Sequence, residues 1–300
     1  MDYVFAGSDK TAAWILQAIS SSQKPSLVIT RKDAPFGRKK TITQTPVADI
    51  ADSQAVKIVK TNDPTEALND IIQTGASRGI IVSYGAILKD EVLDALEWFN
   101  VHFSLLPKYR GAAPVQRAIM DGNTDSGVSI FKLDEGMDTG DLFTQIPVDI
   151  SDMNTAQALE KLADASIEPL LELLKTEQPI CFSQAGDQSL AKKLDRAECF
   201  LDFKTDSESC LRIVNACNPE PIAWTTLQGD AFRIINAATT GISDPGTDHQ
   251  IGQVTKVGKK IYVTCAGSTS LELITVQPFA KKEMPAIDWF NGVGEVILGN

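Results

Sequence analysis

Three polar side chains in the middle of the chain, Asn100, His102 and Asp138, are of the types that could together catalyse acyl transfer. An amide side chain can donate hydrogen bonds to the oxyanion that develops on a carbonyl. A histidine can move a proton near neutral pH, and an aspartate can orient the imidazole and support its charged form. No serine or cysteine stands beside His102. Direct attack of a bound amine on a carbonyl carbon therefore fits better than a covalent mechanism.

The spacing of these residues places two of them side by side. Asn100 and His102 lie in the run 100–103, which has the composition of a short strand. Because side chains alternate along a strand, both point to the same face, at the strand end where open α/β sheets bind ligands. Asp138 follows in the loop 134–141, which is rich in aspartate and glycine. The residues alone also permit a structural interpretation, in which the histidine packs and the loop merely turns.

The elements around these residues predict a doubly wound α/β sheet, because short β-branched runs alternate with helical patterns. We expect strands at 3–6, 26–30, 56–59, 79–84 and 100–103, and helices at 10–22, 64–74, 90–97 and 155–174. Two later strands, at 127–133 and 142–149, could pair antiparallel.

The pattern changes after about residue 180. A polar segment, 183–198, has the composition of a linker, and a helix is expected at 206–217. Short strands at 223–227, 232–235, 253–257, 261–264 and 271–276 follow, which is typical of a small barrel. We therefore predict a catalytic domain at 1–188, a linker at 189–205 and a C-terminal domain at 206–300.

Composition limits the class of protein. The 300 residues are 43% hydrophobic and 22% charged, without a membrane-length apolar run or a basic leader, so a cytoplasmic protein without a membrane partner is expected. The five cysteines are odd in number and form no CxxC pair, which predicts free thiols and neither disulfides nor zinc. With only two histidines, we expect no metal. The net charge of −11 argues against a nucleic-acid partner unless basic residues cluster locally.

Two long motifs resemble those of methionyl-tRNA formyltransferases: NVHFSLLPKYRGAAPVQ at 100–116 and SGVSIFKLDEGMDTGDL at 126–142. The similarity extends to the first strand, VFAG, to IIVSYGAIL, and to NPEPIAW and LITVQPFAKKEM near the C-terminus. The resemblance therefore covers nearly the whole chain. It implies an α/β fold, with a Rossmann-like formyltransferase domain followed by a small C-terminal OB-like β-barrel domain that helps to hold a tRNA.

The resemblance also implies an activity, in which a formyl group passes from 10-formyltetrahydrofolate to the α-amine of methionyl initiator tRNA. Asn100, His102 and Asp138 match the catalytic residues of the formyltransferase superfamily. The positions that match the donor site are Ser104, Leu105, Leu106, Pro107, Tyr84 and Gly85. A monomer is expected.

A basic segment offers a contact for the tRNA in this acidic chain. Residues 31–46 correspond to an inserted loop that the family uses on the tRNA acceptor end. Its first ten residues hold five cations, Arg31, Lys32, Arg38, Lys39 and Lys40, against the single acid Asp33. This local reversal of charge suits phosphate binding. By the resemblance, Arg38 matches the arginine that contacts the acceptor stem.

Other functions stay open at this point. A related formyltransferase could act on an amino-sugar nucleotide, a hydrolase could give the formyl group to water, and an inactive relative could bind folate or RNA. The intact set of Asn100, His102 and Asp138 argues against the inactive relative. The basic loop and the C-terminal domain favour tRNA over a sugar. Five further lysines, Lys256, Lys259, Lys260, Lys281 and Lys282, could form a local patch for the tRNA.

Overall fold

The computed structural model describes residues 1–37, 39–239 and 250–299, and it divides into two compact units. Unit 1 comprises Met1–Pro114, Asp125–Asp149 and Leu159–Ala191, and unit 2 comprises Val115–Thr124, Ile150–Ala158 and Lys192–Asn300. The domain limits of 1–188, 189–205 and 206–300 stay a prediction. No helix within the described residues has the length and apolar character that crossing a bilayer requires.

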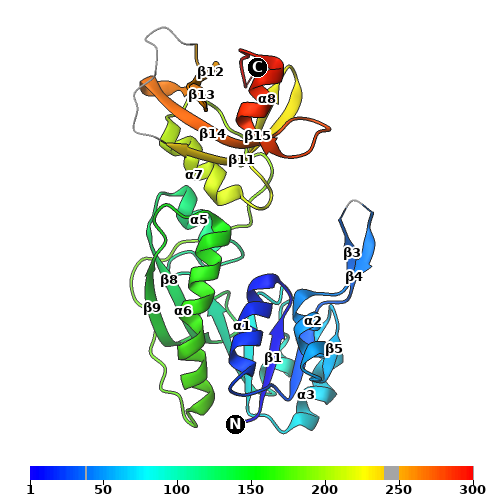
Figure 1. Ribbon diagram of the computed structural model, residues 1–300. Helices are drawn as coiled ribbons and strands as arrows, with labels where there is room; N and C mark the ends of the chain where they lie inside the picture. The colour runs from blue at the N-terminus through cyan, green and yellow to red at the C-terminus, as the bar shows by residue number, and fades with distance from the viewer. Residues whose placement is uncertain (38, 240–249, 300) are drawn as a thin grey trace. The chain divides into compact units, whose positions relative to one another are not determined.

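Unit 1 is built on a seven-stranded sheet in the order β5-β2-β1-β6-β7-β8-β9 (Figure 1). The pairs from β5 to β7 are parallel, and β8 and β9 add two antiparallel strands. This confirms the predicted Rossmann-like class. The strands are β1 (Tyr3–Gly7), β2 (Leu27–Thr30), β5 (Ile58–Lys60), β6 (Arg78–Val82), β7 (Glu97–His102), β8 (Asp125–Lys132) and β9 (Leu142–Asp149).

Helices cover both faces of this sheet. Val4 and Ala6 of β1 pack in one core cluster with Ile71 of α3 and Val92 of α4. The alternate residues of β1 face the other side, where Trp14 of α1 donates to Asp164 of α6 (2.8 Å). The helices of unit 1 are α1 (Lys10–Ser20), α2 (Pro46–Ser53), η1 (Pro64–Ala67, a 3-10 turn), α3 (Leu68–Thr74), α4 (Asp90–Leu93) and, from Leu159 on, α6 (Thr155–Lys175). Apart from Pro114, α5 (Pro114–Met120) belongs to unit 2.

The basic segment 31–46 forms a hairpin and the start of a helix instead of an irregular loop. Strand β3 (Ala34–Phe36) pairs antiparallel with β4 (Thr41–Thr43), and this ribbon extends away from the main sheet of unit 1 (Figure 1). Helix α2 then begins at Pro46, where Thr45 caps it by accepting from Ala48 N–H (3.1 Å). The threonine cap followed by proline is a helix-start signal that the sequence analysis overlooked.

Unit 2 carries an antiparallel sheet in the order β10-β11-β14-β13-β12, with β15 paired to β14. This confirms the predicted small C-terminal β domain. Helices α7 and α8 flank it, and residues of both contribute to its core cluster, including Val214 and Trp289. The elements are α7 (Ser207–Cys217), β10 (Trp224–Leu227), β11 (Asp230–Thr239), β12 (Val254–Val257), β13 (Lys260–Cys265), η2 (Ala266–Ser268), β14 (Thr269–Gln277), β15 (Met284–Pro285) and α8 (Ala286–Val293).

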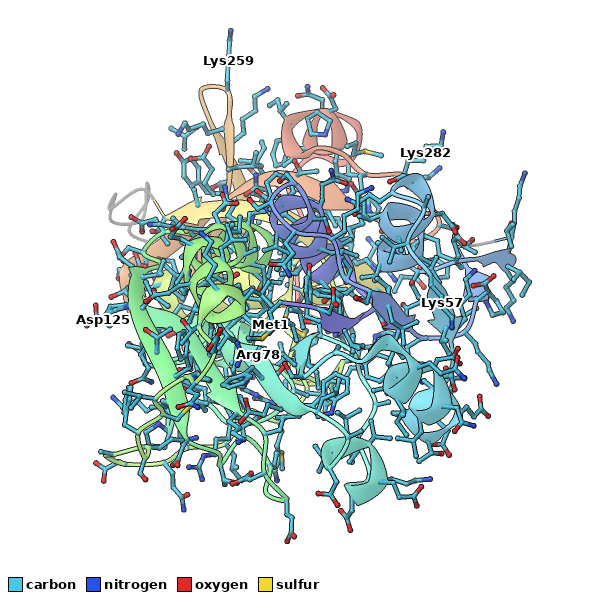
Figure 2. The ribbon with its side chains drawn as sticks, turned by 90° about the horizontal axis from the view of Figure 1, so that it is seen from below. Met1, Lys57, Arg78, Asp125, Lys259 and Lys282 are labelled. Carbon is cyan, nitrogen blue, oxygen red and sulfur yellow. A yellow bond between two sulfur atoms is a disulfide. The ribbon has the colours of Figure 1, made fainter. Side chains whose placement is uncertain are left out.

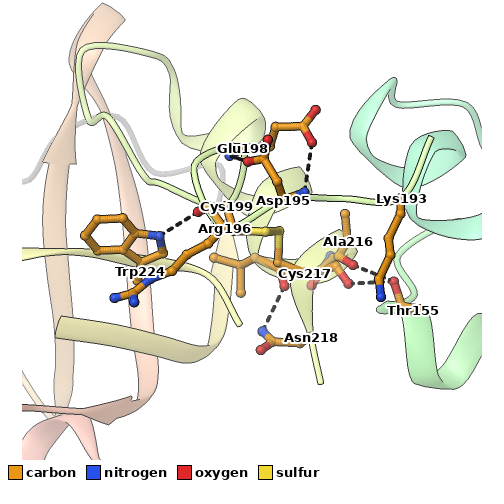
Figure 3. The surroundings of a disulfide bond; sticks show 12 residues. Thr155, Lys193, Asp195, Arg196, Glu198, Cys199, Ala216, Cys217, Asn218 and Trp224 are labelled. Carbon is orange, nitrogen blue, oxygen red and sulfur yellow. Dashed lines mark hydrogen bonds between the residues drawn. A yellow bond between two sulfur atoms is a disulfide. The ribbon is translucent and has the colours of Figure 1, made fainter. Parts of the chain in front are cut away.

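The prediction of five free thiols is wrong for two cysteines. Cys199 and Cys217 form a disulfide, while Cys181, Cys210 and Cys265 are free. Figure 3 shows the bond joining the segment around Cys199 to the end of α7. The pairing escaped the sequence analysis because folding, and not sequence spacing, brings two residues 18 positions apart together.

Candidate catalytic site

Strand β7 places the first two candidate side chains. It lies between β6 and β8, pairing Asn100 with Ile81 on one side and with Phe131 on the other. Asn100 and His102 are separated by one residue of this strand, so their side chains share a face of the sheet. β7 begins at Glu97, three residues before the predicted start, and ends at His102. The pair therefore stands at the carboxyl end of a central strand, as predicted.

His102 is buried and oriented by a main-chain oxygen. Its Nε2 lies 2.8 Å from the carbonyl oxygen of Tyr109. Because a carbonyl can only accept, Nε2 must carry the proton in this hydrogen bond. Nδ1 is then the nitrogen that can gain or lose a proton. The imidazole side chain is only 6% exposed, and its ring also meets Phe131 edge to face.

The structure brings Asp138 to this second nitrogen. Its Oδ2 lies 3.7 Å from His102 Nδ1, which is an ion-pair distance for the charged imidazole and too long for a direct hydrogen bond. Burial lowers the pKa of His102, whereas the Asp138 carboxylate and the Tyr109 carbonyl act to raise it. The resting imidazole is therefore neutral at physiological pH, the form that can accept a proton.

Asp138 is held in an unusual backbone conformation. Its φ is 54°, in the left-handed region that non-glycine residues rarely adopt. Gly111 N–H donates to Asp138 Oδ2 (2.7 Å), which fixes the carboxylate. Gly111 itself has φ 118°, and a Cβ at this position would lie 2.9 Å from the carbonyl oxygen of Ala191. Only glycine fits between that backbone and the carboxylate.

The Asn100 side chain is half-buried and makes no hydrogen bond with any residue that the structure describes. Its amide is thus available to an external acceptor on the face that it shares with His102. The structure consequently brings the Asp138 carboxylate to ion-pair distance of His102 and places Asn100 on the same face of β7 as His102. This is an arrangement of a neutral base, a carboxylate and a free amide donor, which suits attack on a carbonyl.

The predicted donor residues follow β7 in a tightly braced loop. Ser129 Oγ accepts from Leu106 N–H (3.0 Å), and Gln145 Nε2 donates to the carbonyl oxygen of Leu106 (2.8 Å). Ser104 Oγ donates to the carbonyl oxygen of Lys108 (2.6 Å), and the Leu106–Pro107 peptide is cis. Leu105, in contrast, is half-buried. The loop therefore presents a fixed main chain next to His102.

Tyr84 and Gly85 are placed differently. The Tyr84 ring belongs to the core, and its hydroxyl donates to the carbonyl oxygen of Thr61 (3.3 Å). Any ligand contact by Tyr84 must then use its main chain. Gly85 is exposed, with φ 77°, and its carbonyl oxygen accepts from the guanidinium of Arg31.

Partners that no sequence pattern predicted hold the site, and they lie in the return segment, defined as residues 182–191. Ser189 Oγ accepts from Tyr109 N–H (2.8 Å), so it braces the carbonyl that orients His102. Gln184 Nε2 donates to the carbonyl oxygens of Asp138 and Gly140 (2.9 Å each). Arg110, from the first of the two motifs, donates to Gln184 Oε1 (2.6 Å). No sequence motif marks these contacts, because the segment looks like a polar linker.

Some cations of the basic hairpin bind other side chains of unit 1, and others have no carboxylate partner among the described residues. Arg31 donates to Asn62 Oδ1 (2.8 Å) and Lys32 pairs with Glu66 (3.4 Å), so both are bound to the body of unit 1. Lys39 and Lys40 are exposed, and neither has a carboxylate partner within the described part of the chain. Arg38 lies outside the described residues. Of the predicted tRNA contacts, the structure thus presents Lys39 and Lys40 at the hairpin turn.

The lysines of unit 2 are partly engaged as well. Lys260 pairs with Glu272 (2.7 Å), and Lys256 donates to Asn291 (3.1 Å). Lys259 and Lys282 project outward from the chain (Figure 2). A local patch of these five lysines for the tRNA stays a prediction.

Comparison with known proteins gives matches over nearly the entire chain. A family model described as formyl transferase matches residues 3–172, and one described as formyl transferase, C-terminal domain, matches residues 193–294. The chain is 36% identical to a methionyl-tRNA formyltransferase of Clavibacter michiganensis, covering 98% of this chain and 97% of the relative. It is 34% identical to the protein of the same name from Leifsonia xyli, covering 99% and 100%.

Solved structures share the fold at lower identity. HypX from Aquifex aeolicus in complex with tetrahydrofolic acid has a TM-score of 0.68 at 13% identity, over 97% of this chain and 47% of that longer chain. An N-formyltransferase from Helicobacter canadensis, in complex with folinic acid and dTDP-3-aminofucose, gives 0.65 at 18%, over 93% and 100%. A methionyl-tRNA formyltransferase from Clostridium thermocellum gives 0.60 at 15%, over 80% and 94%.

Proposed function

Since the chain belongs to the methionyl-tRNA formyltransferase family, we infer that it transfers a formyl group from 10-formyltetrahydrofolate to the α-amine of methionyl initiator tRNA and so supports translation initiation. The main structural support for this reaction is the geometry of His102 and Asp138. His102 Nδ1 faces the Asp138 carboxylate at 3.7 Å, within the two motifs that resemble the family most closely. The relatives that match across the chain act on methionyl-tRNA by name, whereas the sugar enzyme matches at 18% identity and supports the fold alone.

In the proposed reaction, the methionyl amine attacks the formyl carbon and a tetrahedral oxyanion forms. The Asn100 amide donates to this oxyanion. His102 Nδ1 takes the proton that the amine loses, and the Asp138 carboxylate stabilises the resulting imidazolium. When the bond between the formyl carbon and the folate nitrogen breaks, His102 returns the proton to that nitrogen. All atoms and charges balance without a metal or a covalent enzyme intermediate.

The donor is proposed to bind along the loop of Ser104, Leu105, Leu106 and Pro107 and near Tyr84 and Gly85. Support comes from the fixed main chain of this loop, which Ser129 and Gln145 brace directly beside His102. A preorganised loop would hold the formyl carbon near the base without further ordering on binding. One chain supplies all three side chains of the proposed site, which supports a monomer as the working unit. A cytoplasmic location is proposed on the ground that the relatives act on methionyl-tRNA by name.

A formylation assay tests the function. The protein is incubated with labelled 10-formyltetrahydrofolate and with methionyl initiator tRNA, an amino-sugar nucleotide, or water alone. Label is expected in the tRNA, and its absence there would remove the proposal. Because an oxyanion donor is typically worth about 3–4 kcal/mol, Asn100→Ala should slow turnover by two to three decades on that estimate. Near-normal turnover of Asn100→Ala would refute its role.

The hairpin is tested by the salt dependence of tRNA binding. Each phosphate contact that is lost should reduce the slope of log affinity against log salt by about 1. We expect Lys39→Ala with Lys40→Ala to reduce it by about 2. Lys57 and Lys89, which pair with Asp70 (2.6 Å) and Asp63 (3.0 Å), serve as the matched control, and their double alanine variant should keep the slope. Equal slopes for both double variants would contradict a tRNA contact at the hairpin turn.

A further inference from the structure

The loop that carries Asp138 has few means of its own to hold the carboxylate in place. Most residues from Asp134 to Asp141 are exposed, and Asp138 itself has a left-handed φ of 54°. Such a conformation persists only when neighbouring groups over-determine it. Within the loop, Asp134 accepts from Gly136 N–H (3.1 Å) and from the Thr139 hydroxyl (2.7 Å), but neither bond reaches Asp138 itself. The side chain that contacts the Asp138 main chain comes from elsewhere in unit 1.

Gln184 is the side chain that grips this loop. Its Nε2 donates to the carbonyl oxygens of Asp138 and Gly140 at 2.9 Å each, and so spans the residue that follows Asp138. Its Oε1 accepts from Arg110 Nη2 (2.6 Å). Because a guanidinium can only donate, Arg110 settles which way the amide is turned. One amide thus uses its acceptor and both of its donors within unit 1.

We propose that Gln184 is a positioning residue for catalysis, which acts by holding Asp138 opposite His102. The inference deepens the proposed function and rests on it. Ser183 Oγ, which donates to Asp141 Oδ1 (3.0 Å), and the pairing of Phe182 with Leu142 anchor the same end of the return segment to this loop. Gln184 is therefore delivered by main chain that is itself fixed to the strand following Asp138. It does not touch the reacting atoms.

Substitutions at Gln184 separate this role from simple packing. Gln184→Met keeps the length of the side chain and removes all three hydrogen bonds. Gln184→Glu keeps the acceptor for Arg110 and loses the donors. It therefore tests the hydrogen bonds to the Asp138 and Gly140 carbonyl oxygens separately from the contact with Arg110. Gln188→Met is the matched control, because Gln188 Oε1 also accepts from Arg110 (2.9 Å) but touches no described residue of the Asp138 loop. Circular dichroism and the midpoint of thermal unfolding verify that each variant is folded at the assay temperature.

Single-turnover formylation of methionyl initiator tRNA is then measured for these variants, for Asp138→Asn and for Asp138→Asn with Gln184→Met. Because small misplacements of catalytic groups can cost up to about 100-fold, we expect both Gln184 variants to lower the rate by about tenfold or more. The KM values of donor and tRNA should stay unchanged, and Gln188→Met should match the unaltered protein. Since Gln184 acts through Asp138, Gln184→Met should add less than about twofold to the loss in Asp138→Asn.

Three outcomes would overturn the inference. The first is equal rates for the Gln184 variants and Gln188→Met. The second is a full multiplication of the two losses in the double variant, because Gln184 would then act independently of Asp138. The third is a near-normal rate for Asp138→Asn, which would instead refute the proposed catalytic assignment itself. Failure of the Gln184 inference is thereby distinguished from failure of the proposed catalytic function.

Discussion

At the scale of the residue, burial and hydrogen-bond or ionic partners shift the pKa of the His102 imidazole in opposite directions. Burial disfavours its charged form, while the Asp138 carboxylate at 3.7 Å and the Tyr109 carbonyl at 2.8 Å favour it. Burial dominates, so the pKa of His102 lies below its ordinary value. A group of this kind rests in the base form and gains its charge only when substrate chemistry delivers a proton.

This pKa shift makes a prediction about stability. Between pH 7.5 and 5.5 the unfolded chain takes up a proton on residue 102, with an ordinary pKa of about 6.5, while the folded protein, whose pKa is lower, takes up less of one. The unfolded state then binds more protons, so acidification destabilises the fold. As the pH falls over this interval, we expect His102→Gln to gain stability relative to the unaltered protein, by at most about 1.4 kcal/mol, which is the limit set by the unfolded-state pKa. Urea unfolding at both pH values measures the difference, and a difference that is independent of pH would contradict the shifted pKa.

At the scale of the element, one buried cation links the start of β6 to the end of α6. Arg78 is 1% exposed, yet it donates to the carbonyl oxygens of Leu173 and Thr176. Leu173 lies in the last turn of α6, where carbonyls lack the full helical pattern of partners, and Thr176 directly follows the last residue of that helix. Arg78 therefore supplies donors to main-chain carbonyls at the end of α6, and it joins that helix to the catalytic sheet.

Replacing this arginine should be far more costly than replacing a neighbouring surface cation. Arg78→Met removes the donors to the Leu173 and Thr176 carbonyl oxygens and one cationic partner of the Glu97 carboxylate (3.5 Å), so we expect a loss of about 3 kcal/mol of stability. Lys132 contacts the same carboxylate at 2.8 Å but is 46% exposed. Lys132→Met should therefore cost at most about 1 kcal/mol. Chemical denaturation compares the two, and similar losses would rule out a special role for the buried cation.

At the scale of the whole molecule, each unit has its own hydrophobic core. The cluster around Val4 and Ile81 belongs to unit 1, and the cluster around Phe232 and Val263 belongs to unit 2. Proteins of this kind commonly unfold in more than one step. The Cys199–Cys217 disulfide lies entirely in unit 2, so its contribution should be confined to the transition of that unit.

The disulfide closes a segment with a separation of 18 residues, for which chain entropy suggests about 3 kcal/mol of stabilisation. Reduction, or Cys199→Ala with Cys217→Ala, should lower the denaturant midpoint of unit 2 alone. Cys181→Ala, at a free and half-buried thiol, is the control. Without reductant, the unfolded protein should expose three thiols, corresponding to the free cysteines. A count of five in protein kept from reductants would refute the bond.

The elements of the fold could be predicted where a local pattern specified them. The apolar run at β1 and the long amphipathic helix α6, found at Thr155–Lys175, were predicted nearly to their ends. The helix predicted at 90–97 ends at Leu93 because β7 begins at Glu97 and takes the intervening chain into the sheet. Helices α5 and α8, at Pro114–Met120 and Ala286–Val293, were missed, since short helices depend on packing more than on periodicity.

Some features of the candidate site could likewise be predicted from local sequence, and others depend on the tertiary structure. By itself, the sequence determined the residue types of Asn100, His102 and Asp138 and, through the alternation of a strand, the common face of the first two. Only the tertiary structure decided that the Tyr109 carbonyl orients His102, that Gln184 holds Asp138 and that Cys199 meets Cys217. The physical reason is that main-chain acceptors look alike in every sequence, and a partner far along the chain is selected by the folded geometry, which leaves no local pattern to read.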